Sequence, residues 1–183
     1  MSRYFIVDVE ATSATPFSGV MTEFAVVHFR NVPEVDRCRD TFHAVLVETL
    51  PADGPVPVPD PTAPTIDPLP IARSLERWLA ARTDARPTFV SDNPAFDFMW
   101  IAWLFDSLGR DNPFGFSARR IGDFHAGLNG DFDDAHRWKT LRRTPHTHHP
   151  VDDAVGNAEA LHELVHHPNR PVPERFPGRP TSE

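Results

Sequence analysis

The sequence has little cysteine and no long apolar run, and each absence excludes a class of protein. The one cysteine among 183 residues is Cys38, which excludes an internal disulfide framework and any zinc site built from several cysteines. No apolar stretch is long enough to cross a bilayer, so we expect no membrane partner. Asp8 and Glu10 interrupt the first apolar segment, which is not typical of a secretion signal. We therefore expect a cytoplasmic protein.

Positive charge is also scarce. The formal net charge of -8 at pH 7 argues against a protein that coats nucleic acid by bulk electrostatics. The exception is the stretch 137–149, which contains arginines, histidines and a lysine but no acid. This basic stretch suits a local phosphate contact, with Arg142 and Arg143 as candidate binding residues. The alternative is a solvated helix or loop face.

Hydrophobic periodicity predicts one α/β domain over residues 1–167, with a mixed sheet flanked by helices. Successive strands favour an antiparallel meander at the start of the chain. The strands that the sequence predicts are 3–9, 20–29, 40–48 and 88–91. The predicted helices run from 71 to before Pro87, from 94 to 108, from 117 to 128 and from 150 to 166.

Proline is concentrated in two segments. Residues 51–70 contain prolines at short intervals, which exclude a central strand and a helix interior, so this segment is predicted to be an extended surface connection. A second proline-rich segment, 168–183, is predicted to be a flexible tail outside the core.

Two acids close the first predicted strand. Asp8 and Glu10 are two residues apart, so the period of a strand places both on one face. Neighbouring carboxylates at the end of a buried strand repel each other and lose solvation. A divalent cation between them would relieve both costs; the alternative is that both acids simply face water.

A third acid occupies an apolar helix face. Asp97 lies one turn into the helix that begins at Pro94, and its neighbours at helical spacing are Trp100, Ile101 and Leu104. An acid that only complemented the helix dipole would more comfortably face solvent. The pattern therefore favours a functional role for Asp97.

The last predicted helix carries two adjacent acids in different phases. Asp152 is in line with Glu159 and Glu163, whereas Asp153 is in line with apolar positions such as Leu164. We therefore expect Asp152 and the two glutamates to face solvent, and Asp153 to point inward.

Histidines precede this helix at positions 146, 148 and 149, and only His148 stands five residues before the inward acid. Three segments then occur in a fixed order: Asp8-Val9-Glu10, Asn93 to Phe96-Asp97, and His148 to Asp153. In this order they resemble the DEDDh subgroup of the 3′-5′ exonuclease superfamily, which includes ribonuclease T, oligoribonuclease and polymerase proofreading domains. The resemblance covers about residues 3–165, and the ordered set is far more specific than any one motif.

The resemblance implies a ribonuclease H-like fold and a metal-dependent reaction. Asp8, Glu10, Asp97 and Asp153 would bind two Mg²⁺ or Mn²⁺ ions around a scissile phosphodiester, and oxygen-only ligands suit such hard cations. One ion would lower the pKa of the attacking water, the other would stabilise the leaving oxygen, and His148 would accept the proton of the water. The product would be a 5′ nucleoside monophosphate.

The resemblance also implies how the substrate is held. Thr12 would contact the 3′ hydroxyl of the terminal sugar, while Asn93 and Phe96 would line the same cleft, with packing the better interpretation of Phe96. Single-stranded nucleic acid is the expected partner, with RNA slightly favoured. Many members of the superfamily are dimers, so a homodimer is one expected assembly.

Two other functions are compatible with the sequence. One is the same chemistry directed at DNA in repair or proofreading. The other is a binding protein that keeps the fold without turnover. The sequence argues against this last function, because all four acids and His148 are present.

Overall fold

The structure is a computed structural model of the chain. It describes residues 2–30, 40–50, 56–60, 62–63 and 66–167. The predicted tail, 168–183, lies outside the described residues, as does part of the proline-rich segment.

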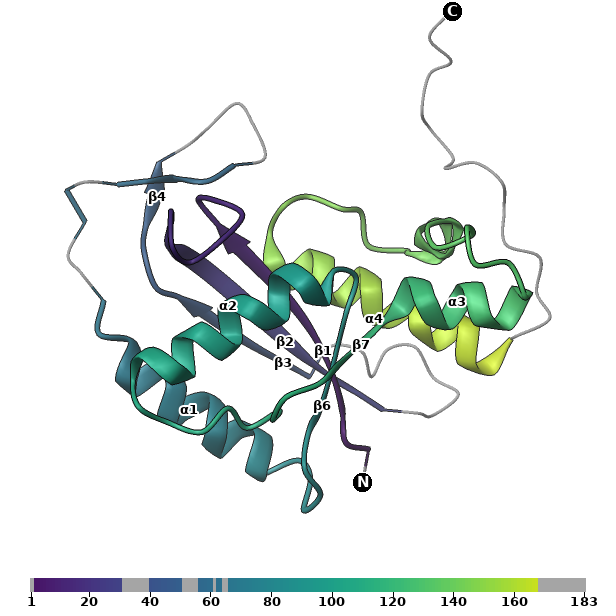
Figure 1. The fold of residues 1–183 in the computed structure, drawn as a ribbon, viewed down its shortest axis with the longest axis horizontal. Helices are drawn as coiled ribbons and strands as arrows, with labels where there is room; N and C mark the ends of the chain where they lie inside the picture. The colour runs from purple at the N-terminus through teal and green to yellow at the C-terminus, as the bar shows by residue number, and fades with distance from the viewer. Residues whose placement is uncertain (1, 31–39, 51–55, 61, 64–65, 168–183) are drawn as a thin grey trace, which may run out of the picture.

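A five-stranded mixed sheet forms the centre of the fold, in the order β3-β2-β1-β6-β7 (Figure 1). Its strands are β1 (Tyr4–Ala11), β2 (Met21–Phe29), β3 (Thr41–Val45), β6 (Thr88–Ser91) and β7 (Ala118–Arg120). Strands β1, β2 and β3 pair antiparallel, which confirms the predicted meander. Strand β6 is parallel to β1, and β7 is parallel to β6. The carboxyl ends of β1 and β6 therefore point to the same end of the sheet, here called the edge.

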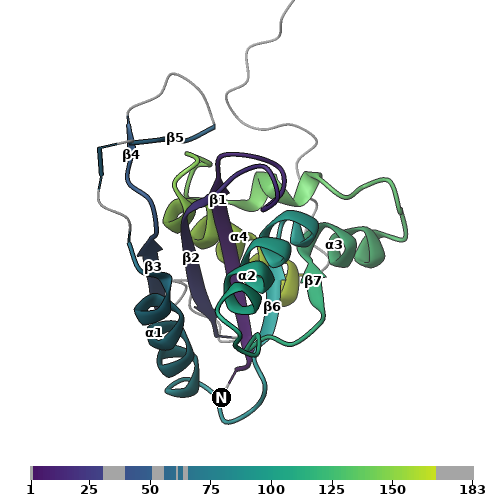
Figure 2. The same cartoon turned by 60° about the vertical axis from the view of Figure 1, so that its left-hand side comes forward.

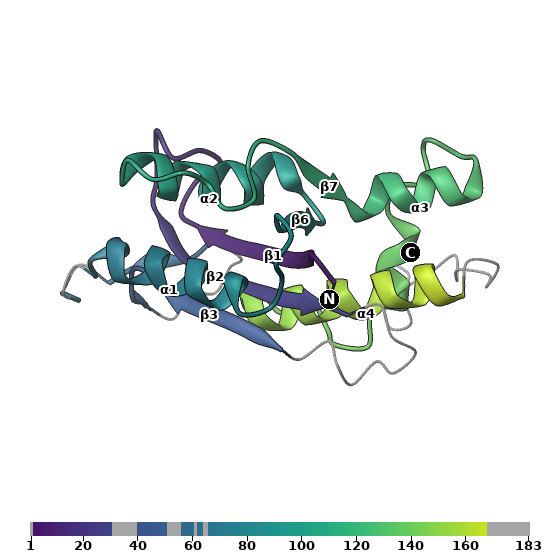
Figure 3. The same ribbon diagram turned by 90° about the horizontal axis from the view of Figure 1, so that it is seen from below.

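Helices cover both faces of the sheet. The helical elements are α1 (Pro68–Ala80), α2 (Pro94–Ser107), α3 (Ile121–Asn129), the 3₁₀ helix η2 (Arg137–Leu141) and α4 (Pro150–His166). Helices α1 and α2 pack on one face, whereas α4 packs on the other with α3 and η2 beside it. Figure 3 shows α2 and α4 on opposite sides of β1. The predicted α/β architecture is confirmed.

Alternation along β1 divides the core into two layers. Phe5, Val7 and Val9 are buried against α1 and α2. Ile6 is buried in the other layer, against α4. Because strand side chains alternate between faces, Asp8 and Glu10 share the face of Ile6. Both acids therefore lie on the side of the sheet that α4 covers.

Helix α4 is buried on nearly every side, and the expectation that Glu159 and Glu163 face solvent is wrong. Both side chains are buried because the segment after η2 packs over them. Glu159 accepts hydrogen bonds from the backbone N–H groups of Arg143 and Thr144, at 3.0 and 2.7 Å. Glu163 accepts one from the guanidinium of Arg143 at 2.8 Å. The two glutamates thus bind the basic stretch to α4.

Gly156 allows this close approach. A Cβ atom at this position would lie 2.8 Å from the carbonyl oxygen of Thr144, closer than a carbon and an oxygen normally come. The segment that leads to His148 therefore packs directly on the backbone of α4.

Two local predictions need correction. Helix α1 begins at Pro68 inside the predicted connection 51–70, because Asp67 caps it by accepting a hydrogen bond from the N–H of Leu69 at 3.0 Å, and proline is tolerated in a first turn. The predicted helix 117–128 begins only at Ile121, because the residues before it form β7.

The described part of the proline-rich connection pairs with the chain just after β3. Strands β4 (Thr49–Leu50) and β5 (Val58–Pro59) form a separate two-stranded sheet. Figure 2 shows it beyond the end of β3. Pro59 fits there because neither strand is central.

In the described part of the chain, no helix is long and apolar enough to cross a membrane.

The contacts of Glu159 make a testable prediction about stability. We expect Glu159→Ala to lower the free energy of unfolding by about 2–4 kcal/mol, because it leaves two backbone N–H groups without their acceptor. Urea denaturation measures the change. Glu48→Ala is the matched control, because Glu48 is exposed. A loss in Glu159→Ala no larger than in the control would show that the glutamate does not hold this segment.

Candidate active site

Four acids from three elements converge at the edge where β1 and β6 end. Asp8 and Glu10 come from β1, Asp97 from the first turn of α2, and Asp153 from the first turn of α4. Asp8, Glu10 and Asp153 each place a carboxylate oxygen within 4.8 Å of the others. Asp97 lies next to this group of three without belonging to it: its Oδ1 accepts a hydrogen bond at 3.2 Å from the N–H of Val9, and its charge raises the pKa values of both strand acids.

Asp97 reaches the cluster from the opposite face of the sheet. Asp97 is only 4% exposed, which confirms that its side chain points inward as expected. Helix α2 begins directly after β6, with Asn93 as N-cap residue, so the first turn overhangs the end of β1. Burial raises the pKa of Asp97 to about 7.

The strand acids are strongly perturbed. Burial is the largest cause that raises the pKa of Asp8, followed by the charges of Asp97 and Asp153. Burial and the charge of Asp153 raise the pKa of Glu10 to about 8. The positive charge of Arg142 acts in the opposite direction and lowers the pKa of Asp8. One arginine does not balance the negative charge that this cluster would carry when fully ionised.

One carboxylate oxygen of Asp153 accepts a hydrogen bond and the other does not. The residue is 1% exposed, as its helical phase predicts. Its Oδ1 accepts a hydrogen bond from the N–H of Thr147 at 3.1 Å. Its Oδ2 is buried and, among the described residues, has no hydrogen-bond partner. Nδ1 of His146 lies 2.7 Å from this oxygen, in ion-pair contact without the direction of a hydrogen bond.

This site fits divalent cations. A buried carboxylate oxygen without a hydrogen bond is costly unless a positive charge satisfies it. The four carboxylates provide only oxygen ligands, which hard cations such as Mg²⁺ and Mn²⁺ prefer. Asp8, Glu10, Asp97 and Asp153 could therefore hold the ions that the sequence predicts.

The three histidines before α4 take different positions. His146 and His148 pack edge to face with ring centroids 4.2 Å apart, and both lie with Asp153 in a second group of potential ligands. His149 turns away toward His43 on β3, with ring centroids 5.3 Å apart. The structure thus places His148 beside the acids and separates it from His149, while His146 lies equally close.

The backbone at His148 is unusual. Its φ angle of 59° is in the left-handed region, which non-glycine residues rarely adopt. The turn carries the chain from the segment packed on α4 into the first turn of the helix. This conformation leaves the His148 side chain exposed at the mouth of the acid cluster.

The residues predicted to bind substrate surround this edge. Oγ1 of Thr12 accepts a hydrogen bond from the N–H of Val20 at 3.0 Å, which closes the loop after β1. Asn93 is exposed, and its side chain makes no capping hydrogen bond. Phe96 is half-buried and packs edge to face on Trp100, with ring centroids 6.2 Å apart.

The basic stretch makes ion pairs within the protein. Arg142 has a side chain only 9% exposed, which donates to Asn157 and lies 3.7 Å from Asp92. Lys139 also donates to Asp92. Arg143 is 59% exposed and pairs with Glu163. Arg142 therefore fits neither of the two predictions for this stretch, a solvated face or an exposed phosphate patch. Phosphate binding by Arg142 and Arg143 stays a prediction.

Sequence reasoning missed two groups near the site. Asp92 directly follows β6 and forms ion pairs with Lys139 and Arg142 of the basic stretch. In the sequence, only its position just before Asn93 could have indicated that it lies near the site. Glu23 lies opposite Glu10 in the β1–β2 register and contributes to the raised pKa of Glu10. Strand pairing could have indicated Glu23, but register is not visible in one sequence.

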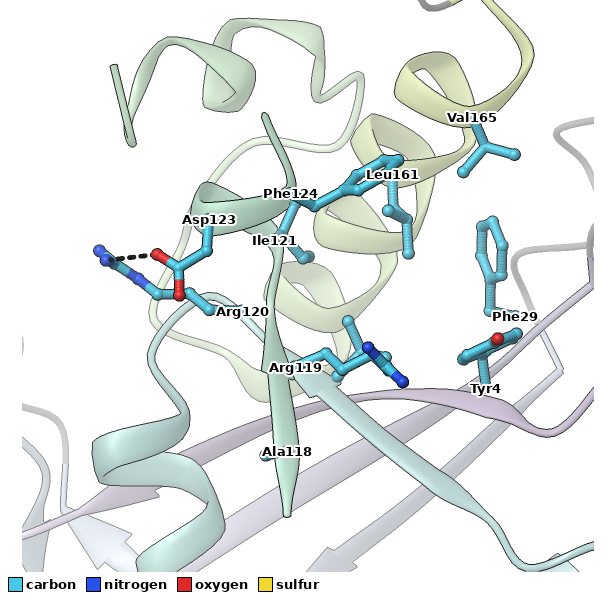
Figure 4. A pocket seen from close by; sticks show the side chains of 11 residues that line it. Tyr4, Phe29, Ala118, Arg119, Arg120, Ile121, Asp123, Phe124, Leu161 and Val165 are labelled. Atoms are coloured by element: carbon cyan, nitrogen blue, oxygen red, sulfur yellow. Dashed lines mark hydrogen bonds and ion pairs between the residues drawn. The ribbon is translucent and has the colours of Figure 1, made fainter. Parts of the chain in front are cut away.

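A cavity of about 700 Å³ lies elsewhere, near the amino end of β1 (Figure 4). Its lining includes Tyr4, Phe29, Arg119, Phe124, Leu161 and Val165. The four acids lie at the carboxyl end of β1, so this cavity is not part of the candidate site.

The fold is similar to known nuclease structures. The sequence matches no family model and has no significant match to a curated protein. The nuclease domain of 3′hExo, a DEDDh family member bound to rAMP, has a TM-score of 0.63 and 13% identity over 88% of this chain and 90% of that chain. Cell-death related nuclease 4 has a TM-score of 0.48 and 15% identity over 88% of this chain and 63% of that chain. The likeness to the 3′hExo domain confirms the expected ribonuclease H-like fold.

The raised pKa values predict how stability depends on pH without metal. The folded protein keeps the proton of Glu10 from its ordinary pKa of 4.5 up to about 8, so unfolding releases this proton in that interval. Its contribution to stability is complete below pH 4.5 and lost as the pH rises to about 8. The raised pKa of Asp97, about 7, has the same sign.

Asp8→Asn isolates this effect, because it removes one charge from the cluster and nearly preserves its shape. In EDTA we expect the variant to unfold at a higher temperature than the unmodified protein at pH 8, with the difference shrinking toward pH 4. Thermal denaturation across this range measures it. A variant that is equally destabilised at every pH would contradict repulsion among the acids.

Proposed function

We propose that this protein is a metal-dependent 3′-5′ exonuclease that removes nucleotides from single-stranded nucleic acid and releases 5′ nucleoside monophosphates. The observation that carries the proposal is the convergence of Asp8, Glu10, Asp97 and Asp153. The raised pKa values of the first three acids, and the buried Oδ2 of Asp153 that lacks a hydrogen bond, are what a bound cation would relieve. The fold that holds them is similar to a DEDDh nuclease domain.

The four acids would hold two Mg²⁺ or Mn²⁺ ions. When bound, these ions supply an activated water molecule and stabilise negative charge at the phosphodiester. The protein contributes their placement: β1 fixes two carboxylates, and the first turns of α2 and α4 bring one each. Arg142 adds a fixed positive charge near Asp8.

His148 would accept the proton of the attacking water. His149 is a poor candidate because its ring faces His43 on β3. His146 contacts the oxygen of Asp153 that a cation would need, so a bound cation would displace this imidazole. His148 lies in the same group, is exposed, and makes no ion pair with an acid among the described residues. It therefore suits the role of general base best.

Substrate recognition would use the residues around the edge. Thr12 would contact the terminal 3′ hydroxyl, with Asn93 and the edge of Phe96 beside it. Arg142 and Arg143 would attract the phosphate backbone as far as their internal ion pairs allow. The rAMP bound to the 3′hExo domain supports RNA as the substrate over DNA.

Asp153 and its neighbour Asp152 provide a sharp test. We expect Asp153→Asn to abolish cleavage of 3′-terminal nucleotides from labelled RNA and DNA oligomers in Mg²⁺ or Mn²⁺. Asp152→Asn is the matched control: this acid accepts a hydrogen bond from Thr147 at 2.9 Å, and its loss should cost at most about 1 kcal/mol of stability and little activity. Equal loss of activity in both variants would contradict the assignment of the metal ligand.

The same assay decides among the alternatives. Preference for DNA oligomers would assign the chemistry to repair or proofreading. Binding of single strands without cleavage in either metal would indicate a silent binding protein. Cleavage that persists in EDTA would overturn a metal-dependent mechanism.

The general base is tested by three single variants. We expect His148→Ala to retain metal and nucleic-acid binding but to react about 100 to 10,000 times more slowly, the usual contribution of a positioned base. Single-turnover rates across the acidic limb of the pH profile measure this. His146→Ala and His149→Ala are the controls. A rate in His148→Ala equal to that of the unmodified protein, or a larger defect in His146→Ala, would show that the base is another histidine.

A further inference from the structure

A third group of potential metal ligands lies beside the four acids and shares no residue with them or with the group of Asp153, His146 and His148. It consists of Glu23 on β2, His43 on β3 and His149 at the N-cap of α4. Their ligand atoms all lie within 4.8 Å of one another. Nε2 of His43 is 2.8 Å from Oε2 of Glu23, and the rings of His43 and His149 have centroids 5.3 Å apart.

Strand register explains why these side chains meet. Glu23 pairs with Glu10 across β1 and β2, and His43 pairs with Ala25 across β2 and β3. Glu23 and Ala25 are two residues apart, so Glu23 and His43 share the sheet face on which α4 packs. His149 then reaches both from the start of α4. Three separate elements therefore present one ligand each toward a common point.

Glu23 has an acid opposite it and a histidine beside it. Glu10 and Glu23 lie directly opposite each other in an antiparallel pair. Two like charges in such a pair destabilise the sheet. In the described part of the chain, no arginine or lysine forms an ion pair with Glu23, and His43 is its basic partner. The side chains of Glu23 and His43 are 20% and 33% exposed, so a cation can reach them from solvent.

We propose that Glu23, His43 and His149 form a separate site for a transition-metal cation of the Zn²⁺ class. Two imidazoles and one carboxylate are typical zinc ligands, and three protein ligands leave a position open for water. Imidazole ligands disfavour Mg²⁺, which prefers oxygen, so the two sites differ in the ion they select. This site would bind metal whether or not the chain cleaves nucleic acid.

The site also has a consequence for the candidate active site. His149 follows His148 directly, so a cation on His149 would hold the left-handed turn against β2 and β3. This second role, positioning His148, rests on the proposed function.

Co²⁺ is a suitable probe because its visible spectrum reports on imidazole ligands. The experiment uses the full chain carrying Asp8→Asn and Asp153→Asn, which disables the acid cluster and the group of Asp153, His146 and His148 together. We expect this protein to bind one equivalent of Co²⁺ that Zn²⁺ displaces and excess Mg²⁺ does not. Adding His43→Ala or His149→Ala should weaken binding by more than about 100-fold, since loss of an outer-shell partner alone costs about 10- to 100-fold.

His136→Ala is the matched control, because His136 is an exposed histidine outside the site. It should leave Co²⁺ binding unchanged. Equal binding in His43→Ala and His136→Ala would overturn the site and leave His43 and Glu23 as an ion pair only. Absence of Co²⁺ and Zn²⁺ binding in the Asp8→Asn and Asp153→Asn protein would overturn it as well.

A second measurement on the unmodified protein covers the case in which the double variant fails to fold. In NMR spectra of the imidazole groups, Zn²⁺ in the presence of excess Mg²⁺ should shift the signals of His43 and His149 together, before those of His136. Shifts of His146 and His148 without His43 would contradict the proposal. Neither experiment contains nucleic acid, so a failure of the exonuclease proposal gives a separate result.

Discussion

The removal of clustered carboxylates from water, with the repulsion between them, is the physical cost around which this fold is built. Three elements of the core hold these carboxylates in place. Strand β1 carries Asp8 and Glu10 between two packed layers, and the first turns of α2 and α4 carry Asp97 and Asp153. Burial raises the pKa values of Asp8, Glu10 and Asp97, and the charges of neighbouring site acids raise those of Asp8 and Glu10 further. The site therefore lowers the stability of the metal-free fold when these acids ionise. Groups of residues that destabilise their own fold in this way are typically functional sites.

The burial of α4 shows how the fold supports that arrangement. A helix that only covered a sheet would expose one polar side, but here Glu159 and Glu163 are buried under the segment after η2 and hold its backbone. This segment leads to the histidines, so its attachment determines where His148 lies. The acids of α4 thus divide into Asp153, which faces the site, and glutamates that fix the approach to it. Arg142, packed between Asn157 and Asp92, joins the same support to the end of β6.

Sequence reasoning predicted the parts of this structure that local pattern controls. Period-2 and helical spacing were sufficient for β1, α2 and α4 and for the inward direction of Asp97 and Asp153, because each depends only on neighbours in the chain. One error was local, since the cap Asp67 and the first-turn Pro68 that begin α1 are visible in the sequence. The other differences arise where distant segments decide: the cover over Glu159, the three-residue parallel strand β7, and the register that places Glu23 opposite Glu10. The helical pattern of α4 alone cannot show that its polar side is covered from outside. The choice between His146 and His148 likewise depends on a contact with Asp153 that spacing does not reveal.

A crystal structure of the protein with Mn²⁺ would show whether the four acids hold divalent cations. Anomalous scattering locates Mn²⁺ without reference to any assumed site. We expect anomalous peaks within coordination distance of the oxygens of Asp8, Glu10, Asp97 and Asp153, with Oδ2 of Asp153 among the ligands and His146 moved away from it. Well-ordered acids without an anomalous peak, at a Mn²⁺ concentration that saturates any binding measured in solution, would contradict it.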